Sequence, residues 1–120
     1  MITPSLTQEI TQLHADICSA LADPRRILIL YSLAERAHNV SELADELAIS
    51  QPATSRHLMI LRERGMVTAQ RDGQAVIYQL ADGRVIQALD LLRGVLADKL
   101  KNQAVLANSV YDGLILELPK

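Results

Sequence analysis

The sequence predicts a mainly α-helical fold with one small β-hairpin. Over most of the 120-residue chain, apolar residues recur at intervals of three and four, which is the spacing of one face of an α-helix. Between about residues 66 and 80 the pattern changes to alternation, and Asp72-Gly73 interrupts it as a hairpin turn does. A chain of this length is expected to form a single domain over residues 1–120.

The helix that precedes the hairpin has clear boundaries in the sequence. Ser50 is a suitable N-cap for a helix over about residues 51–64, because its hydroxyl can accept from a free backbone N–H of the first turn. Gly65 follows the last turn, where a helix commonly ends in a left-handed residue. Leu58, Leu61 and the aliphatic part of Thr54 share one buried stripe, so the opposite side of this helix faces solvent.

The exposed side of this helix and the hairpin carry short or flexible donors and acceptors, which suit base edges and phosphates. His57 is either such a contact or a core residue, and Arg71 at the hairpin tip is placed to reach a phosphate or a minor groove. The set expected to bind DNA comprises Gln51, Thr54, Ser55, Arg56, His57, Arg62, Arg71, Gln74 and Arg26. The alternative is that the arginines form only a solvated face. The helix, its glycine stop and the hairpin together favour DNA binding.

The formal net charge of −2 does not by itself indicate a nucleic-acid-binding protein, but the charges are unevenly placed. Between Ser50 and Leu80, four arginines against two acidic residues leave a charge of +2. Between Glu35 and Glu46, one arginine against four acidic residues leaves −3. The positive charge therefore lies on the expected DNA side. With so few cations per chain, two subunits are needed for useful affinity at physiological salt.

Two amphipathic helices are expected to flank this region. In the first, over about residues 5–22, the apolar stripe is Leu6, Ile10, Leu13, Ile17 and Leu21. It packs either on the core of the same domain or on a second subunit. The last helix, over about residues 83–107 with Asp82 as its cap, has an apolar face wider than a small domain needs: Val85, Ile86, Leu89, Leu92, Val95, Leu96 and Leu100. We interpret this face as part of a two-fold dimer interface.

The role of the tail over residues 108–120 is left open by the sequence. Asp112-Gly113 is expected to break the last helix. The apolar run over residues 114–118 is expected to pack back on the domain or on a partner subunit.

Two further helices are expected before the helix over about residues 51–64. Asp23 is a suitable N-cap for one of them, with Pro24 at its first position, and Asn39 with Glu42 forms a capping-box pattern for the other. Arg26 lies in the first turn of the earlier helix. It either makes a structural salt bridge or contacts a DNA phosphate.

The segment SQPATSRHLMILRERGMV (residues 50–67), followed by RDGQAVIYQL (residues 71–80), resembles the winged helix-turn-helix of the ArsR/SmtB family of small bacterial repressors. The resemblance extends to ALADPRRILIL (residues 20–30) and NVSELADELAIS (residues 39–50) and covers roughly residues 15 to 100. It implies a winged helix-turn-helix that dimerises through its first and last helices and binds a double-stranded DNA operator. It also implies regulation by an inducer, which in this family is often a metal ion.

The residues of the family's two familiar metal sites are not present. The third-helix site needs a cysteine pair, and the corresponding residues 38–43 contain no thiol. In the last-helix site Asp82 matches, but Arg84 and Val95 stand where histidines are required, and Asp98 stands where a glutamate is usual. Without the imidazoles a tetrahedral zinc site is not expected there. We therefore predict no metal and no cofactor.

Cys18 is the single cysteine, and His14 lies one helical turn before it. One interpretation is a redox or effector site, in which cationic His14 activates the thiol and two subunits cross-link. A weaker version is a two-ligand metal site completed by the other subunit. The other interpretation is a small apolar residue in a helical interface. An enzyme built on this pair is not expected, because one helical turn cannot form a substrate pocket and an oxyanion site.

The sequence thus predicts a homodimeric, sequence-specific DNA-binding regulator, acting as a repressor released by an inducer. The alternative is a winged-helix protein-interaction module that no longer binds DNA. No apolar run is long enough to cross a membrane and the N-terminus lacks the features of a signal peptide, so a cytoplasmic location is expected.

Overall fold

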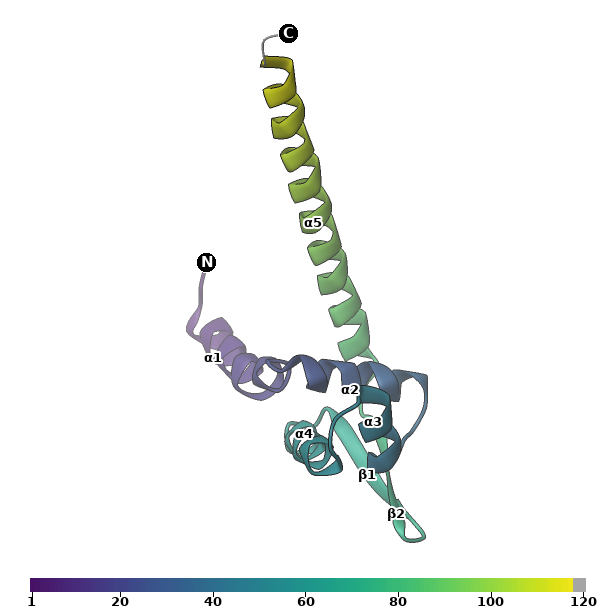
Figure 1. Cartoon of the computed structure of the whole chain (residues 1–120). Coiled ribbons are helices and arrows are strands. Elements are labelled where there is room, and N and C mark those ends of the chain that lie inside the picture. Colours follow the sequence, from purple (N-terminus) through teal and green to yellow (C-terminus); the bar gives the residue numbers. More distant parts are fainter. Residues whose placement is uncertain (118–120) are drawn as a thin grey trace. The chain divides into compact units, whose positions relative to one another are not determined.

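The computed structural model describes residues 1–117, with side chains up to Val110. It groups the chain into two compact units, residues 1–83 and the residues from Arg84 onward (Figure 1). The single domain predicted over residues 1–120 stays a prediction.

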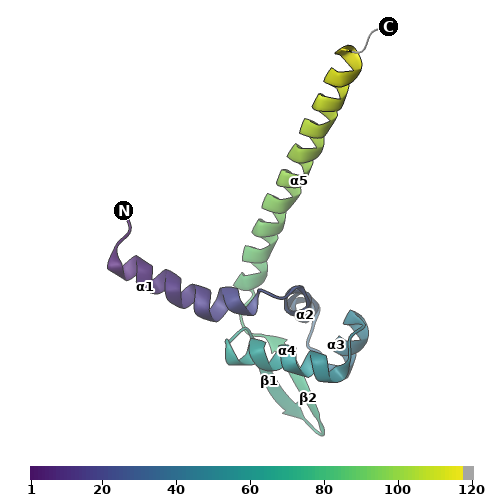
Figure 2. The same cartoon turned by 60° about the vertical axis from the view of Figure 1, so that its left-hand side comes forward.

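The first unit contains every element of the expected winged helix-turn-helix (Figure 2). Its elements in chain order are α1 (Pro4–Leu13), the π-helical turn η1 (His14–Cys18), α2 (Pro24–Glu35), α3 (Val40–Leu47), α4 (Gln51–Glu63), β1 (Val67–Asp72) and β2 (Ala75–Leu80). The second unit consists of one helix, α5 (Arg84–Glu117). The predicted mainly α-helical fold with a small hairpin is confirmed.

The helix starts follow from side-chain caps that the sequence encodes locally. Asp23 accepts a hydrogen bond from the backbone N–H of Arg25 at 2.8 Å and begins α2. Asn39 and Glu42 form the reciprocal capping box of α3, with distances of 2.8 and 3.0 Å. Ser50 accepts from Ala53 N–H at 3.2 Å and begins α4.

The core of the first unit lies between α2, α3 and α4. Its largest fully buried apolar side chains are Ile29, Leu30, Leu43, Leu58 and Leu61. Removing such side chains from water is the main favourable contribution to folding, worth about 1.5–3 kcal/mol for each. This packing fixes α4 against the two preceding helices.

The hairpin pairs in antiparallel register from Val67 opposite Leu80 to Asp72 opposite Ala75. Only two residues close it, and Gly73 occupies the first of these positions with a φ of 64°. Glycine adopts this positive φ without steric cost, which is why Asp-Gly signals a tight hairpin. At the other side, the backbone of Tyr78 exchanges hydrogen bonds of 2.8 and 3.2 Å with His38, which attaches the wing to the segment before α3.

Two expectations for the flanking helices are wrong. The first helix is not a uniform α-helix, because residues His14–Cys18 form a π-helical turn in which the Ser19 N–H donates to the His14 carbonyl. The last helix does not break at Asp112-Gly113 but continues to Glu117. The predicted packing of residues 114–118 concerns side chains outside the described ones. Among the described residues, no helix has both the length and the apolar character needed to span a bilayer.

Candidate nucleic-acid interface

The turn between α3 and α4 determines where α4, the helix that the sequence predicts to bind DNA, begins. Ala48 ends α3 in the left-handed conformation, with φ 56° and ψ 42°, although it has a Cβ. A non-glycine residue here costs of the order of 1 kcal/mol, so packing on both sides must hold the turn in place. The sequence places a tight turn at residues 48–51, but it did not reveal the left-handed conformation of Ala48, because the residue that marks this conformation is usually glycine.

Six of the predicted DNA-binding residues are exposed, on α4 and at the wing. They are Gln51, Ser55, Arg56, Arg62, Arg71 and Gln74. Within the described part of the chain, the guanidinium groups of Arg56, Arg62 and Arg71 have no carboxylate partner. By contrast, Arg25 and Arg36 each form an ion pair at 3.1 Å. The uncompensated positive charge of the first unit therefore includes three arginines of the helix and the wing.

Thr54 does not belong to this exposed set. Its side chain is completely buried, and its hydroxyl donates to the Ser50 carbonyl at 2.9 Å. The prediction that Thr54 contacts DNA is wrong. Thr54 also belongs to the predicted buried stripe of this helix, and a side chain on that stripe faces the core and not solvent.

His57 is also buried, with 8% of its surface exposed. Its Nδ1 lies 3.4 Å from the guanidinium of Arg26 on α2. Burial lowers the pKa of His57 below its ordinary value, while the Asp23 carboxylate acts in the opposite direction. The exposed position expected for His57 is wrong, and the core alternative describes it.

Arg26 holds the end of the first helix. Its Nε donates to the Ala20 carbonyl at 2.6 Å, and a terminal nitrogen donates to the Ser19 carbonyl at 3.3 Å. Cations are favoured at this end of a helix, where carbonyls lack backbone donors. Arg26 therefore has a structural role, which was one of the two alternatives from the sequence. Its acceptors are backbone carbonyls, however, and not the carboxylate of the expected salt bridge. Arg26 is therefore not among the candidate DNA-binding residues that the structure leaves exposed.

Arg64, at the C-terminal end of α4, has a role that the sequence did not reveal. Its guanidinium donates to the Ala15 carbonyl and lies 3.6 Å from a carboxylate oxygen of Asp16. The hydrogen-bonded residues are 49 positions apart in the chain. No local pattern signals a contact over such a separation.

His14 and Cys18 lie at the two ends of the π turn, and both are exposed in the single chain. A thiol that senses an effector must be exposed, and so must a residue that becomes buried only when two subunits associate. The exposure of Cys18 therefore does not distinguish the two interpretations. Among the described residues, no three His, Cys, Asp or Glu side chains are placed to hold a metal ion together.

His38 is the other buried histidine, with 4% of its surface exposed. Neither of its ring nitrogens has a hydrogen-bond partner within the part of the chain that the structure describes. Its Nδ1 lies 3.6 Å from a Glu42 oxygen, and its Nε2 lies 3.9 Å from a Glu46 oxygen that also accepts from Ser32 at 2.6 Å. This histidine therefore stands between two carboxylates of α3, on the side of the unit that the wing contacts through its backbone.

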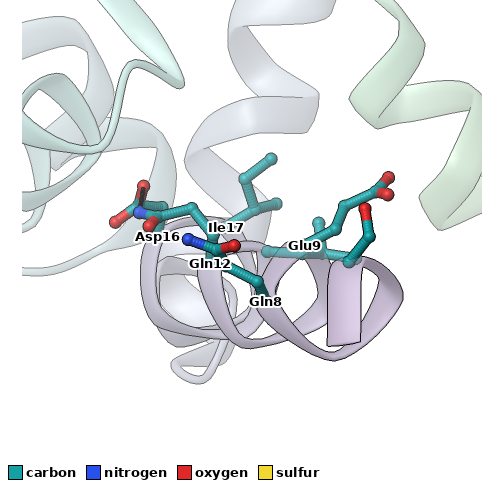
Figure 3. A pocket seen from close by; sticks show the side chains of 7 residues that line it. Gln8, Glu9, Gln12, Asp16 and Ile17 are labelled. Atoms are coloured by element: carbon teal, nitrogen blue, oxygen red, sulfur yellow. Dashed lines mark hydrogen bonds between the residues drawn. The ribbon is translucent and has the colours of Figure 1, made fainter. Parts of the chain in front are cut away.

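A hollow of about 550 Å³ runs along the first helix (Figure 3). Gln8, Glu9, Gln12, Asp16 and Ile17 are labelled there, and all the lining residues come from α1 and η1. Side chains of a single helix cannot surround a small molecule. The hollow therefore fits a surface that packs against another segment better than it fits a ligand pocket.

Comparison with known proteins places these features in one family. Residues 23–69 match the family model described as "Bacterial regulatory protein, arsR family". The HTH-type transcriptional repressor SmtB of Mycobacterium tuberculosis is 44% identical over 75 residues, which are 62% of this chain and 56% of that repressor. The match thus spans little more than half of SmtB. The HTH-type transcriptional regulator Rv0081 of Mycobacterium tuberculosis is 33% identical over 108 residues, 89% of this chain and 95% of that protein.

Solved structures agree with this result. The crystal structure of Rv0081 covers 79% of this chain and 96% of its own, with a TM-score of 0.71 and 36% identity. The solution structure of the homodimeric winged helix-turn-helix DNA-binding domain of Mb0332 from Mycobacterium bovis covers 84% and 93%, with a TM-score of 0.71 and 27% identity. The names of these relatives describe regulators of transcription, which is not an enzymatic role. The chain belongs to the ArsR family of bacterial regulatory proteins.

Proposed function

We propose that this protein is a homodimeric, sequence-specific DNA-binding repressor that an inducer releases from its operator. The observation that carries the proposal is the group of arginines that have no carboxylate partner among the described residues, Arg56 and Arg62 on α4 and Arg71 at the wing. In the proposed complex α4 enters a major groove, where Gln51, Ser55 and Arg56 contact bases or neighbouring phosphates. Arg71 and Gln74 act from the wing.

The apolar surfaces of α1 and α5 support the homodimer. On the first helix, Leu6, Ile10, Leu13 and Ile17 are 37–50% exposed. On α5, the exposed fraction of Leu91, Leu92, Val95, Leu96 and Leu100 is 54–74%. Large apolar side chains in rows of this kind are characteristic of an interface with another protein. The homodimeric state of the Mb0332 domain agrees with a second copy as the partner.

A dimer also meets the electrostatic requirement. Each subunit offers Arg56, Arg62 and Arg71, so a two-fold dimer offers twice as many cations to the two half-sites. If all of them reach phosphates, the slope of log affinity against log salt is roughly −5, from about −0.9 for each phosphate.

The inducer of the proposed repressor differs from the metals that the familiar family sites bind. Val95 and Arg84 provide no imidazole on α5, and α3 provides no thiol. A tetrahedral zinc site of the familiar type needs those ligands. An effector bound at the interface between two subunits is compatible with the exposed first helix.

The second candidate is a protein-interaction module that no longer binds DNA. The observation that favours it is the continuation of exposed apolar residues along α5 to Val105, Leu106 and Val110. Of these three residues, only Val110 lies beyond the helix end that the sequence predicts at about residue 107.

The test is a titration of the reduced protein against its own upstream DNA and against a scrambled duplex, at near-physiological salt. The repressor predicts selective binding with two subunits per site and a steep fall in affinity with salt. Equal and weak binding to both duplexes, with no specific binding at low salt, would reject the repressor in its ligand-free form. That result would favour the interaction module.

A further inference from the structure

The π turn changes the backbone hydrogen bonds of the carbonyls that lie within it. In an α-helix the N–H of Ser19 would donate to the carbonyl of Ala15, four residues earlier. Here it donates to the carbonyl of His14, five residues earlier. The Ala15 carbonyl therefore lacks the donor that an α-helix would supply.

Two side chains donate hydrogen bonds to the Ala15 carbonyl. The hydroxyl of Ser19 donates to it at 2.5 Å, and the guanidinium of Arg64 donates to it from the end of α4. Arg64 also lies 3.6 Å from Asp16, the next residue of the π turn. The π turn thus provides an acceptor and a carboxylate side by side, and the recognition helix provides the cation that binds both.

A second connection joins the middle of α4 to the end of the first helix, through Arg26 of α2. His57 contacts the guanidinium of Arg26, whose other nitrogens bind the carbonyls of Ser19 and Ala20. With one connection, the first helix could still pivot about that contact relative to α4. Two connections, separated along α4 from His57 to Arg64, fix the direction of the helix relative to the first helix.

We propose that Arg64 is a positioning residue that sets the direction of the recognition helix relative to the first helix. The Arg64–Asp16 pair is not buried, since the two side chains are 38% and 47% exposed, and exposed pairs contribute little to stability. Its effect is therefore on geometry more than on folding. The Ser19 hydroxyl and the Ala15 carbonyl belong to the same anchoring site.

The consequence for DNA binding rests on the proposed function. In a two-fold dimer that contains the first helices, the direction of α4 in each subunit determines the separation of the two recognition helices. That separation selects the spacing between operator half-sites. Arg64 is thus a determinant of spacing specificity, even though it contacts no base in this proposal.

The first measurement needs no DNA. Spin labels are attached to cysteines introduced at Gln8 on α1 and Met59 on α4, in a Cys18→Ser background, and the labelled chain is diluted with excess unlabelled chain. Pulsed dipolar spectroscopy is expected to give one narrow distance distribution for the parent. Arg64→Gln and Asp16→Asn should shift or broaden it, and Arg64→Lys, which keeps the charge but loses the planar fork, should lie between.

The second measurement uses operators whose half-site spacing is changed in single base-pair steps. The parent should discriminate steeply between spacings, while Arg64→Gln and Asp16→Asn should discriminate less, with an unchanged salt slope. Asp16→Asn matters because it leaves every positive charge in place. Thermal melting of each variant identifies any that does not fold, and Arg64→Lys and Asp16→Asn then carry the test.

Two results would overturn the proposal. One is a distance distribution that stays the same in Arg64→Gln and Asp16→Asn. The other is a loss of affinity in Arg64→Gln that is equal at all spacings, with a salt slope smaller by about 1, because that is the behaviour of a phosphate contact. If the parent binds no operator, the proposed repressor fails, and the distance measurement still decides the role of Arg64.

Discussion

Arginine residues of this chain have different roles according to their partners. Arg26 and Arg64 bind carbonyls of the first helix, and Arg25 and Arg36 pair with carboxylates. A guanidinium that already binds a carbonyl or a carboxylate has fewer free N–H donors to offer to DNA, and pairing with a carboxylate also offsets its positive charge. At the residue scale, the assignment of a DNA contact therefore depends on what each side chain touches more than on its charge.

Replacing Arg56 with alanine tests the proposed DNA face directly. If Arg56 contacts a base, the loss of binding free energy should be about 1–3 kcal/mol, together with relaxed preference at one base pair. Fluorescence anisotropy with matched and mismatched operators measures both quantities. Arg36→Ala is the control, because Arg36 is also exposed but pairs with Glu42 outside α4 and the wing. Unchanged affinity and sequence preference in Arg56→Ala would mean that α4 faces DNA differently.

His57 should make stability depend on pH. Burial lowers the pKa of the folded state below that of the unfolded chain, so the unfolded chain binds a proton more readily. The free energy of unfolding should therefore decrease as pH falls below about 6.5, the ordinary histidine value. Urea unfolding of the parent and of His57→Gln at several pH values measures this. If the difference between them does not change with pH, burial of the charged ring is not disfavoured.

At the scale of elements, the start of α2 combines a cap with an ion pair. Arg25 lowers the pKa of Asp23 to about 2 through hydrogen bonds from its side chain and its backbone N–H. Asp23→Asn keeps a good cap but removes the charge. Above pH 4 the parent should be more stable than the variant. The difference should decrease as pH falls from 4 through 2 and vanish only below pH 2, where the carboxylate is protonated in both the folded and the unfolded state. Urea unfolding across this range checks the sign.

The elements that local signals specify could be predicted from the sequence. Ser50 and Asn39 cap α4 and α3 because a short polar side chain reaches the free N–H groups of the first turn. The wing was predictable because alternation and the Asp-Gly turn agree. In both cases the determining interactions lie within a few residues along the chain.

Other features were not predictable because distant or weak effects decide them. Apolar periodicity does not distinguish a four-residue from a five-residue hydrogen-bond step, so the π turn at His14–Cys18 was missed. Gly113 does not end α5, since a glycine inside a helix costs only about 1 kcal/mol and adjoining helical residues tolerate it. At the DNA face, the burial of His57 and the contact of Arg64 depend on α2 and on the first helix, which local patterns do not encode.

At the scale of the whole molecule, association and DNA binding should be coupled. Leu96 is 54% exposed on α5, and an aspartate there would place a charge in the proposed subunit interface. Leu96→Asp should convert dimers into monomers in sedimentation velocity and should weaken operator binding, because a monomer contacts only one half-site. Gln87→Asp, at an exposed polar position of the same helix, is the control. A variant that sediments as the parent does would place the interface elsewhere.

The five-residue step of the π turn also has a consequence for how this chain tolerates changes in length. A π turn holds one residue more than the α turn that it replaces, so the first helix is equivalent to an α-helix with a one-residue insertion at His14–Cys18. Deleting Ala15 would remove that extra residue and leave the flanking turns in phase. A deletion between Leu6 and Ile10 would instead rotate the apolar stripe on one side of the gap by about 100° relative to the other. Homologues that differ by one residue in this helix should therefore differ at the π turn.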